Sequence, residues 1–163
     1  MKAQVQIINA DRAKRSVADL AKRLAGHSKV LVGVQKGAGN YNDGTPIAVI
    51  AAANHFGTTT EPKIPARRFL DVAVANKSKR YANIVKRQIP KVLDGKIDMD
   101  AVLDAIGNAA VGDVQDYITD LSEPANAPST IAKKGSSNPL IDTGNLKQSI
   151  RHEIAREHVE EGL

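Results

Sequence analysis

The chain has no cysteine and no tryptophan, and aromatic residues make up only 3% of its 163 positions. Without cysteine it can form neither a disulfide nor a thiolate centre, which excludes disulfide-stapled scaffolds and cysteine-ligated metal sites. A core with so few aromatic rings must be built from Ala, Val, Ile and Leu, and the hydrophobic content of 42% supplies them. The length suits one domain with a single modest core, and we expect that domain to span 1–163.

Long apolar runs are also missing. None approaches the ~18 residues that a membrane-spanning helix needs, and the N-terminal stretch MKAQVQIINADRAKRSVADL lacks the apolar centre of a secretory signal. We therefore expect a soluble, intracellular product with no membrane contact.

Charge is present but unevenly distributed. Residues 1–97 carry 18 Lys and Arg against 6 Asp and Glu, a balance of +12, whereas residues 98–163 carry 5 against 12, a balance of −7. Such a chain can attract polyanions, or can pair one end with the other end of a neighbouring copy. Two separate solvated faces are the plain alternative.

Periodicity and turn residues predict the order of elements. Strands are expected over 3–9 and 28–36, and a helix from Asp11 should stop at Gly26. A short buried helix should begin at Pro46 and end at Gly57, followed by an extended segment over 58–67. The loops 37–46, 57–66 and 123–142 are long for a compact domain, and the last should hold one short helical turn.

Two long helices dominate the centre of the chain. One should run from about Phe69 until Pro90 ends or kinks it. The next, over 98–124, carries six Asp and one Glu and no Lys or Arg, and its apolar residues recur at helical spacing. The basic and acidic helices either pair within the chain or face neighbouring copies. Gly107 and Gly112 weaken the acidic helix by ~1 kcal/mol each, which indicates either the close approach of another helix or ordinary tolerance.

The tripeptide Asp142-Thr143-Gly144 matches the catalytic loop of aspartic proteases. A half-site protease needs an all-β barrel around that loop, and this chain is mostly helical before it, so the protease is a remote alternative. The other interpretation is a capped turn, in which the side chains of Asp142 and Thr143 accept hydrogen bonds from the first N–H groups of a short helix. Leu140 and Ile141 would then anchor the loop, and the segment after Ile150 could be a strand or a helix.

The remaining motifs do not assemble a catalytic, metal or cofactor site. The loop GAGNYNDG lacks the Gly-Lys-Ser/Thr ending of a phosphate loop, and His152 and His158 are six residues apart where a helical zinc site needs four. Asp98, Asp100 and Asp104 lack the glycine and glutamate of a calcium loop and suit a helix start. We therefore expect no enzyme, no metal and no cofactor.

Three pieces of the chain carry a further pattern: HFGTTTEPKIPARRFL (55–70), the basic helix after it, and APSTIAKKGSSNPLIDTGNLKQSI (127–150). Together they resemble one family, the tail-completion or virion-morphogenesis proteins of tailed bacteriophages. In HFGTTTEPKIPARRFL the matching residues are Phe56-Gly57, Ile64-Pro65-Ala66-Arg67 and Phe69-Leu70, and Arg68 departs from the proline common in the family. In APSTIAKKGSSNPLIDTGNLKQSI they are Thr130-Ile131, Lys134-Gly135, Pro139 to Gly144, Leu146 and Ser149-Ile150. The resemblance covers 46–150.

The resemblance implies an α+β subunit in which a small mixed or antiparallel sheet packs against two or more long helices, with long assembly loops. It also implies a non-catalytic virion protein that completes the tail at the neck and joins head to tail. The expected partners are copies of itself in a ring around the DNA, with a hexamer as the first expectation, and neighbouring neck, tail-terminator or tail-tube proteins. The expected locations are the virion and, during assembly, the host cytoplasm.

Two groups of residues become candidates on this basis. The expected assembly-interface residues are Ile64, Pro65, Arg67, Arg68, Phe69, Lys134, Leu140, Asp142, Thr143, Gly144 and Leu146. The basic residues expected to face the lumen and its DNA are Lys77, Lys79, Arg80, Lys86 and Arg87. The same basic helix supports the rival interpretation, a small DNA-binding protein whose affinity falls steeply with salt. The sequence leaves three neck roles open: a tail-completion protein, a tail terminator and a head-side adaptor.

Overall fold

The computed structural model describes Asp19, residues 28–35 and residues 37–156. The strand predicted over 3–9 lies outside these residues, as does the helix that Gly26 should end, apart from Asp19. His158 lies outside them as well. The elements in chain order are β1 (Ser28–Val34), α2 (Ile47–Phe56), α3 (Phe69–Asn76), α4 (Ser78–Leu93), α5 (Met99–Asp120), α6 (Pro128–Lys134), α7 (Asn145–Gln148) and β2 (Ile150–Arg156).

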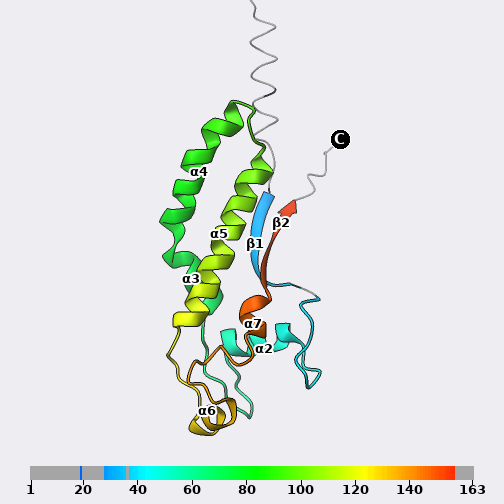
Figure 1. The fold of residues 1–163 in the computed structure, drawn as a ribbon, viewed down its shortest axis with the longest axis vertical. Helices are drawn as coiled ribbons and strands as arrows, with labels where there is room; N and C mark the ends of the chain where they lie inside the picture. Colours follow the sequence, from blue (N-terminus) through cyan, green and yellow to red (C-terminus); the bar gives the residue numbers. More distant parts are fainter. Residues whose placement is uncertain (1–18, 20–27, 36, 157–163) are drawn as a thin grey trace, which may run out of the picture.

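Helix α5 is the centre of the molecule. Helices α3 and α4 pack along one side of it, and the two-stranded sheet packs along another (Figure 1). The short helices α2, α6 and α7 gather with their loops at the lower end of this view. This arrangement confirms the expected α+β fold, with a small sheet against long helices.

The sheet is antiparallel and pairs the two ends of the described chain. Ser28 lies opposite Arg156, and Val34 lies opposite Ile150. The segment after Ser149, for which strand and helix were both open, is therefore a strand. Ile150 is fully buried where this strand begins, so the sheet joins the core at that end.

The core is aliphatic, as the composition requires. Helix α5 contributes Val102, Ala110, Val114 and Ile118, which lie at helical spacing and are at most 3% exposed. Burying such a face stabilises the helix far more than its intrinsic propensity does. Asp98 caps the helix by accepting a hydrogen bond from the backbone N–H of Ala101 at 2.8 Å.

The two glycines of α5 serve different purposes. A Cβ atom on Gly107 would lie 2.2 Å from the ring of His152, so strand β2 approaches the helix closely at that point. A Cβ on Gly112 would meet nothing within 4 Å. Of the two alternatives, Gly112 fits ordinary tolerance, whereas Gly107 marks a close approach, and its partner is a strand instead of the expected helix.

The long basic helix differs from its prediction in two ways. It is divided at Lys77 into α3 and α4, where the backbone leaves helical geometry (φ −109°, ψ 10°). Pro90 does not end α4, which continues to Leu93, because a proline near the end of a helix removes only one of the last hydrogen bonds. Pro46 likewise precedes α2 in an extended conformation instead of occupying its first turn.

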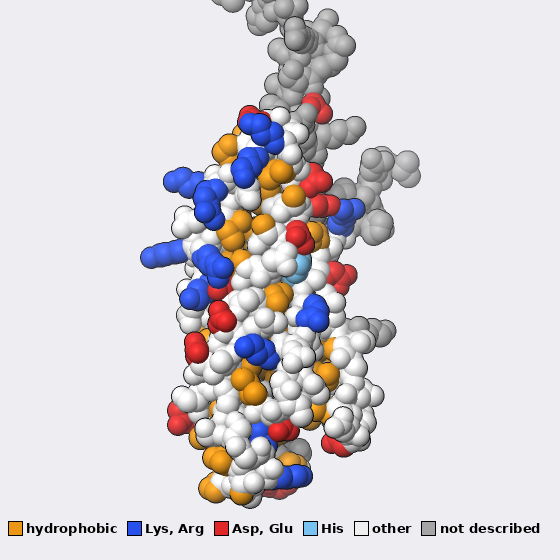
Figure 2. Space-filling view, viewed as in Figure 1, with side chains coloured by type: hydrophobic (Ala, Val, Ile, Leu, Met, Phe, Trp, Pro, Cys, Tyr) orange, Lys and Arg blue, Asp and Glu red, His pale blue; other side chains and the backbone are white. Residues whose placement is uncertain are grey.

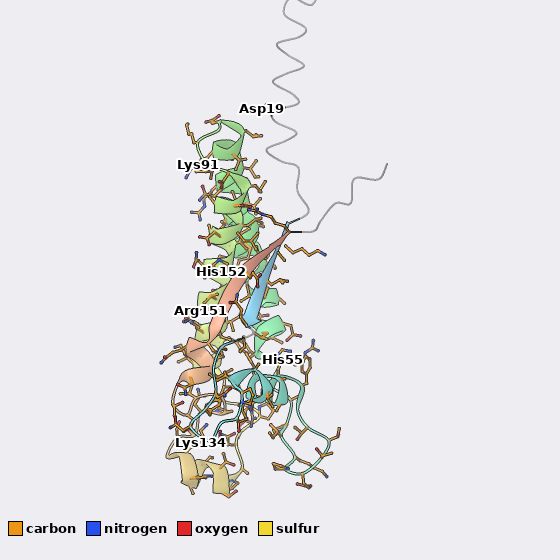
Figure 3. All side chains as sticks on the ribbon, turned by 90° about the vertical axis from the view of Figure 1, so that its right-hand side faces the viewer. Asp19, His55, Lys91, Lys134, Arg151 and His152 are labelled. Carbon is orange, nitrogen blue, oxygen red and sulfur yellow. The ribbon has the colours of Figure 1, made fainter. Side chains whose placement is uncertain are left out.

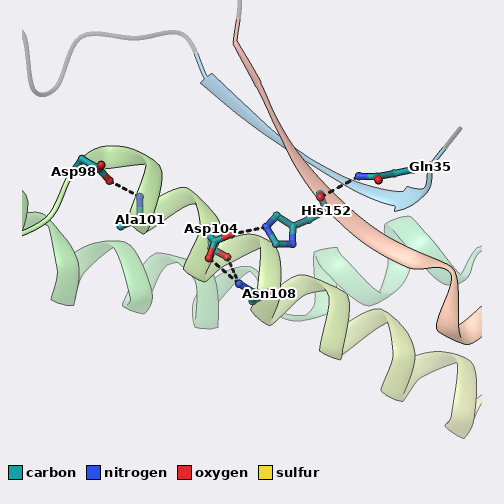
Figure 4. A network of polar contacts seen from close by, with 6 residues as sticks. All are labelled: Gln35, Asp98, Ala101, Asp104, Asn108 and His152. Atoms are coloured by element: carbon teal, nitrogen blue, oxygen red, sulfur yellow. Dashed lines mark hydrogen bonds and ion pairs between the residues drawn. The ribbon is translucent and has the colours of Figure 1, made fainter. Parts of the chain in front are cut away.

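The acidic side chains of α5 are bound mainly by strand β2. Asp104 contacts the His152 ring at 2.9 Å and also accepts from Asn108, while Gln35 of the loop after β1 donates to the carbonyl oxygen of His152 (Figure 4). Asp100 pairs with Arg156. Between α4 and α5 the described residues form one ion pair, Arg80 with the buried Asp113. The intrachain pairing of basic and acidic helices is thus limited to a single point.

Candidate functional site

The two stretches that resemble the phage family meet in one cleft of about 510 Å³. One wall is the extended segment 62–65, and the other is formed by α6 with the loop that precedes α7. Ile50 and Asn54 of α2 lie between the walls. Segments more than sixty residues apart in sequence therefore build a single surface hollow at the lower end of the molecule.

Arg67 holds the two walls together. Its side chain is 3% exposed and donates to the carbonyl oxygens of Pro124 (2.8 Å) and Ala125 (3.1 Å). It also donates to the side-chain oxygens of Asn54 (2.9 Å) and Asn126 (3.1 Å). Burial lowers the pKa of the guanidinium, and its several hydrogen bonds compensate for that desolvation.

The end of α2 fixes the position of the first wall. Gly57 has a φ of 77°, and a Cβ there would lie 2.9 Å from backbone atoms of Ile64 and Ala66. The N–H of Thr58 donates to the carbonyl of Ile64 at 2.9 Å, and the N–H of Arg67 donates to that of Asn54 at 2.7 Å. A side chain at position 57 would push the end of α2 away from the backbone of Ile64 and Ala66, so glycine is required there.

Asn138 positions the second wall. Its side-chain oxygen accepts from the N–H groups of Leu140 and Ile141, both at 2.9 Å, and its amide donates to the carbonyl of Thr119 at 2.9 Å. This ties the loop to the end of α5 and leaves Leu140 buried, as the anchor prediction required. The prediction missed Asn138 itself, although an Asn-Pro pair is a common turn signal.

The cleft has a mixed electrostatic rim. Burial lowers the pKa of Lys134, an effect that nearby Asp142 opposes and Arg67 reinforces. Lys134 also donates to the carbonyl of Asn138 at 2.9 Å. Burial raises the pKa of Tyr41, and the carboxylate of Asp142 raises it further. With an apolar floor and a few polar groups, the cleft is suited to holding a protein side chain.

The predicted interface residues divide into three sets. Those that line the cleft are Ile64, Pro65, Arg67, Lys134, Leu140, Asp142 and Leu146. Phe69 is fully buried in the core instead, and Arg68 is exposed and pairs with Asp71. Thr143 and Gly144 lie in the loop before α7 and do not line the cleft. Since Arg67, Leu140 and Leu146 are at most 6% exposed, they shape the cleft from beneath.

The capping role predicted for Asp142 is wrong, and that of Thr143 is met only by one long hydrogen bond. The residue before α7 is Gly144, in the left-handed region at φ 83°, and no side chain caps the helix. The hydroxyl oxygen of Thr143 is 3.5 Å from the N–H of Asn145, at the outer limit for a hydrogen bond, and Asp142 turns outward to the cleft. The all-β barrel that an aspartic protease requires is absent from the described part of the chain, which holds two strands.

The predicted basic residues lie along α4 and its start. Lys77, Lys79, Arg80, Lys86 and Arg87 are all exposed, and blue side chains line the α4 side of the molecule in Figure 2. Arg80, Asn83, Lys86 and Arg87 border a shallow groove of about 530 Å³. Within the described residues, Arg80 is the member of this set that forms an ion pair.

The described residues contain no group of three or more potential metal-binding side chains. No helix among them is sufficiently long and apolar to cross a membrane. Comparison with known proteins gives no matching family model, no matching curated protein and no matching solved structure.

Proposed function

We propose that this chain is a structural protein of a tailed bacteriophage, which completes the tail at the neck and takes part in joining it to the head. The subunit acts as a ring around the tail axis, and its partners are copies of itself and adjacent neck or tail proteins. Its place is the virion, after assembly in the host cytoplasm. It needs neither catalysis nor a cofactor for this role.

One observation carries the proposal. The two stretches that resemble the family are separated in sequence, yet seven of the eleven residues singled out from them line one cleft. If the two short motifs matched the family only by chance, we would not expect them to share a surface. A docking hollow held rigid by Arg67 and Asn138 gives such a reason, because assembly interfaces are built on preorganised surfaces.

The charge distribution supports a ring. Members of a ring meet through two different faces, so each subunit must present complementary surfaces at separate places. Basic side chains lie along α4, while Asp116 and Asp120 on α5 are exposed and form no ion pair within the described residues. Such separation of charge suits head-to-tail contact between copies.

The test is made in a phage lysate. The gene is inactivated in the phage genome, and the particles are counted by electron microscopy, with the gene supplied in trans as the control. The expected result is DNA-filled heads and full-length tails that remain separate, and joined virions only after complementation. Normal joined virions without the protein, or an absence of tails altogether, would refute the proposal.

A second candidate is non-specific DNA binding through α4. The observation in its favour is the groove bordered by Arg80, Lys86 and Arg87, whose cations can contact phosphates without reading sequence. Each phosphate contact adds about −0.9 to the slope of log affinity against log salt concentration. Replacing Lys86 and Arg87 by Gln should reduce that slope by about 2 if both bind phosphate.

The matched control for DNA binding combines Lys63→Gln with Lys133→Gln, which removes two exposed cations that lie outside α4. Fluorescence anisotropy with duplex DNA at several salt concentrations measures all variants. An equal loss in the control would show attraction by net charge alone and not by α4.

A further inference from the structure

Helix α2 carries an exposed apolar ridge. Phe56 is 76% exposed and Val49 is 56% exposed, and Ala52 between them is exposed as well. Their spacing of three and four residues places them on one face of the helix, in the pattern of helices that dock into apolar grooves. Phe56 is one of two phenylalanines in the chain, and the other, Phe69, is fully buried.

The ridge is held rigidly. The His55 ring packs edge-on against Phe56 at 4.6 Å and against Phe69 at 5.3 Å, so three rings extend from the core to the surface. His55 belongs to α2, where Figure 3 labels it, and is itself 6% exposed. A ring supported in this way projects outward without the entropy cost of ordering it on contact.

The ridge and the cleft lie on different sides of the same helix. Ile47, Ala51 and His55 form the buried face of α2, and Ile50 and Asn54 face the cleft. At 100° per residue, the direction of Phe56 differs from that of Asn54 by about 160°. The hydrogen bonds of Thr58 and Arg67 to the adjoining backbone fix the cleft wall to α2. Ridge and cleft therefore belong to one rigid unit and point in different directions.

We propose that the α2 ridge of one copy, led by Phe56, docks into the cleft of a second copy of this chain. The contact is heterologous, with each copy offering a ridge to one neighbour and a cleft to another. Because the two surfaces have a fixed relative orientation, repeated contacts follow a constant rotation. Such a contact closes into a ring when that rotation divides a full turn, and otherwise continues as an open filament.

Size and chemistry favour a second copy as the occupant. The cleft, of about 510 Å³, has room for the single aromatic ring that leads the ridge. Leu140 and Leu146 in its floor match the aromatic tip of the ridge, and Arg67 beneath them has its hydrogen bonds satisfied within the chain. One chain supplies both surfaces, so no separate partner is required for either.

The absence of cysteine from the chain makes a clean test possible. One variant carries Ala52→Cys on the ridge, and a second carries Thr130→Cys in the cleft, so each has a single thiol. The two are mixed and treated with a short flexible bismaleimide. The expected product is a heterodimer that forms about tenfold faster than either homodimer, a difference equivalent to about 1.4 kcal/mol.

Two controls distinguish docking from random collision. Adding Phe56→Asp to the Ala52→Cys chain should slow the reaction about tenfold, and circular dichroism checks that this variant stays folded. Ser78→Cys, exposed at the start of α4, replaces Thr130→Cys as the matched site and should give no preferred product. Equal rates with Phe56→Asp, or with Ser78→Cys, would overturn the proposal.

Light scattering on the unmodified chain supplies an independent outcome. The wild type should form oligomers and the Phe56→Asp variant should be a monomer at the same concentration, whereas a monomeric mass for both would overturn the proposal. The inference rests on the ring of the proposed function, but the contact between the ridge and the cleft is measured with purified protein. Its failure would leave the test of tail joining in phage lysates unaffected.

Discussion

Arg67 is the residue whose replacement should most clearly separate a structural clamp from a surface cation. Arg67→Ala removes four side-chain hydrogen bonds of 2.8–3.1 Å that join α2 to the loop after α5. A hydrogen bond from a charged donor contributes about 1.5–3 kcal/mol in a protein. The loss of stability that we expect is smaller than the summed contribution of four such bonds, for two reasons.

The first reason is that water can replace part of the lost contact, since Pro124 and Ala125 are exposed in the loop. The second is that the variant no longer desolvates a guanidinium, the cost that the lowered pKa of Arg67 reveals. We therefore expect Arg67→Ala to lower the free energy of unfolding by about 3 kcal/mol. For a chain of this length that corresponds to a fall of roughly 6–12 °C in the melting temperature.

The adjacent residue is the matched control. Arg68 is exposed and forms one surface ion pair with Asp71, so Arg68→Ala should cost less than about 1 kcal/mol. Urea unfolding followed by circular dichroism measures both variants. If Arg67→Ala and Arg68→Ala fell within about 0.5 kcal/mol of each other, the clamp would be refuted. A loss of amide protection confined to 123–127 and Asn54 would locate the effect at the cleft.

Two further predictions concern α5 and its neighbours. Gly112→Ala should stabilise the protein by about 0.5–1 kcal/mol, because alanine favours the helix and meets no neighbour there. Gly107→Ala should destabilise it by about 1–3 kcal/mol, because the added methyl group displaces His152. Thermal unfolding measures both variants, and changes of the same sign would contradict the prediction. Burial, and then the hydrogen bond to Asp113, raise the pKa of Tyr81, so the folded state keeps this proton while the unfolded state loses it near pH 10. The free energy of unfolding should therefore fall as pH rises above about 10, and the fall should be smaller in Tyr81→Phe; equal slopes in urea titrations would count against it.

Much of the local structure could be predicted from the sequence. Helix α5 was recognisable because its apolar residues recur at helical spacing over six turns and Asp98 precedes the first turn as a cap. Strand β1 was recognisable as a short β-branched run between polar segments. These features depend on residues within a few positions of each other, so propensity and periodicity are sufficient to place them.

The errors arose where distant residues decide the outcome. The segment 150–156 has no clear period, and it is a strand because β1, more than a hundred residues earlier, offers a pairing edge. Asp142 does not cap α7, because the residue before the helix is Gly144 in the left-handed conformation, and Asp142 lines the cleft instead. Gly107 and Gly112 look alike in sequence, and only the approach of His152 distinguishes them.

The sequence by itself determined the composition of the core, the helical stripes, the uneven charge and the two motif-bearing stretches. The tertiary structure alone decided that these stretches share one cleft, that Arg67 lies buried between its walls, and that Phe56 points away from it. The physical reason is that periodicity reports which face of an element is apolar. It carries no information about which other element, brought close by the folding of the whole chain, will cover that face or leave it exposed.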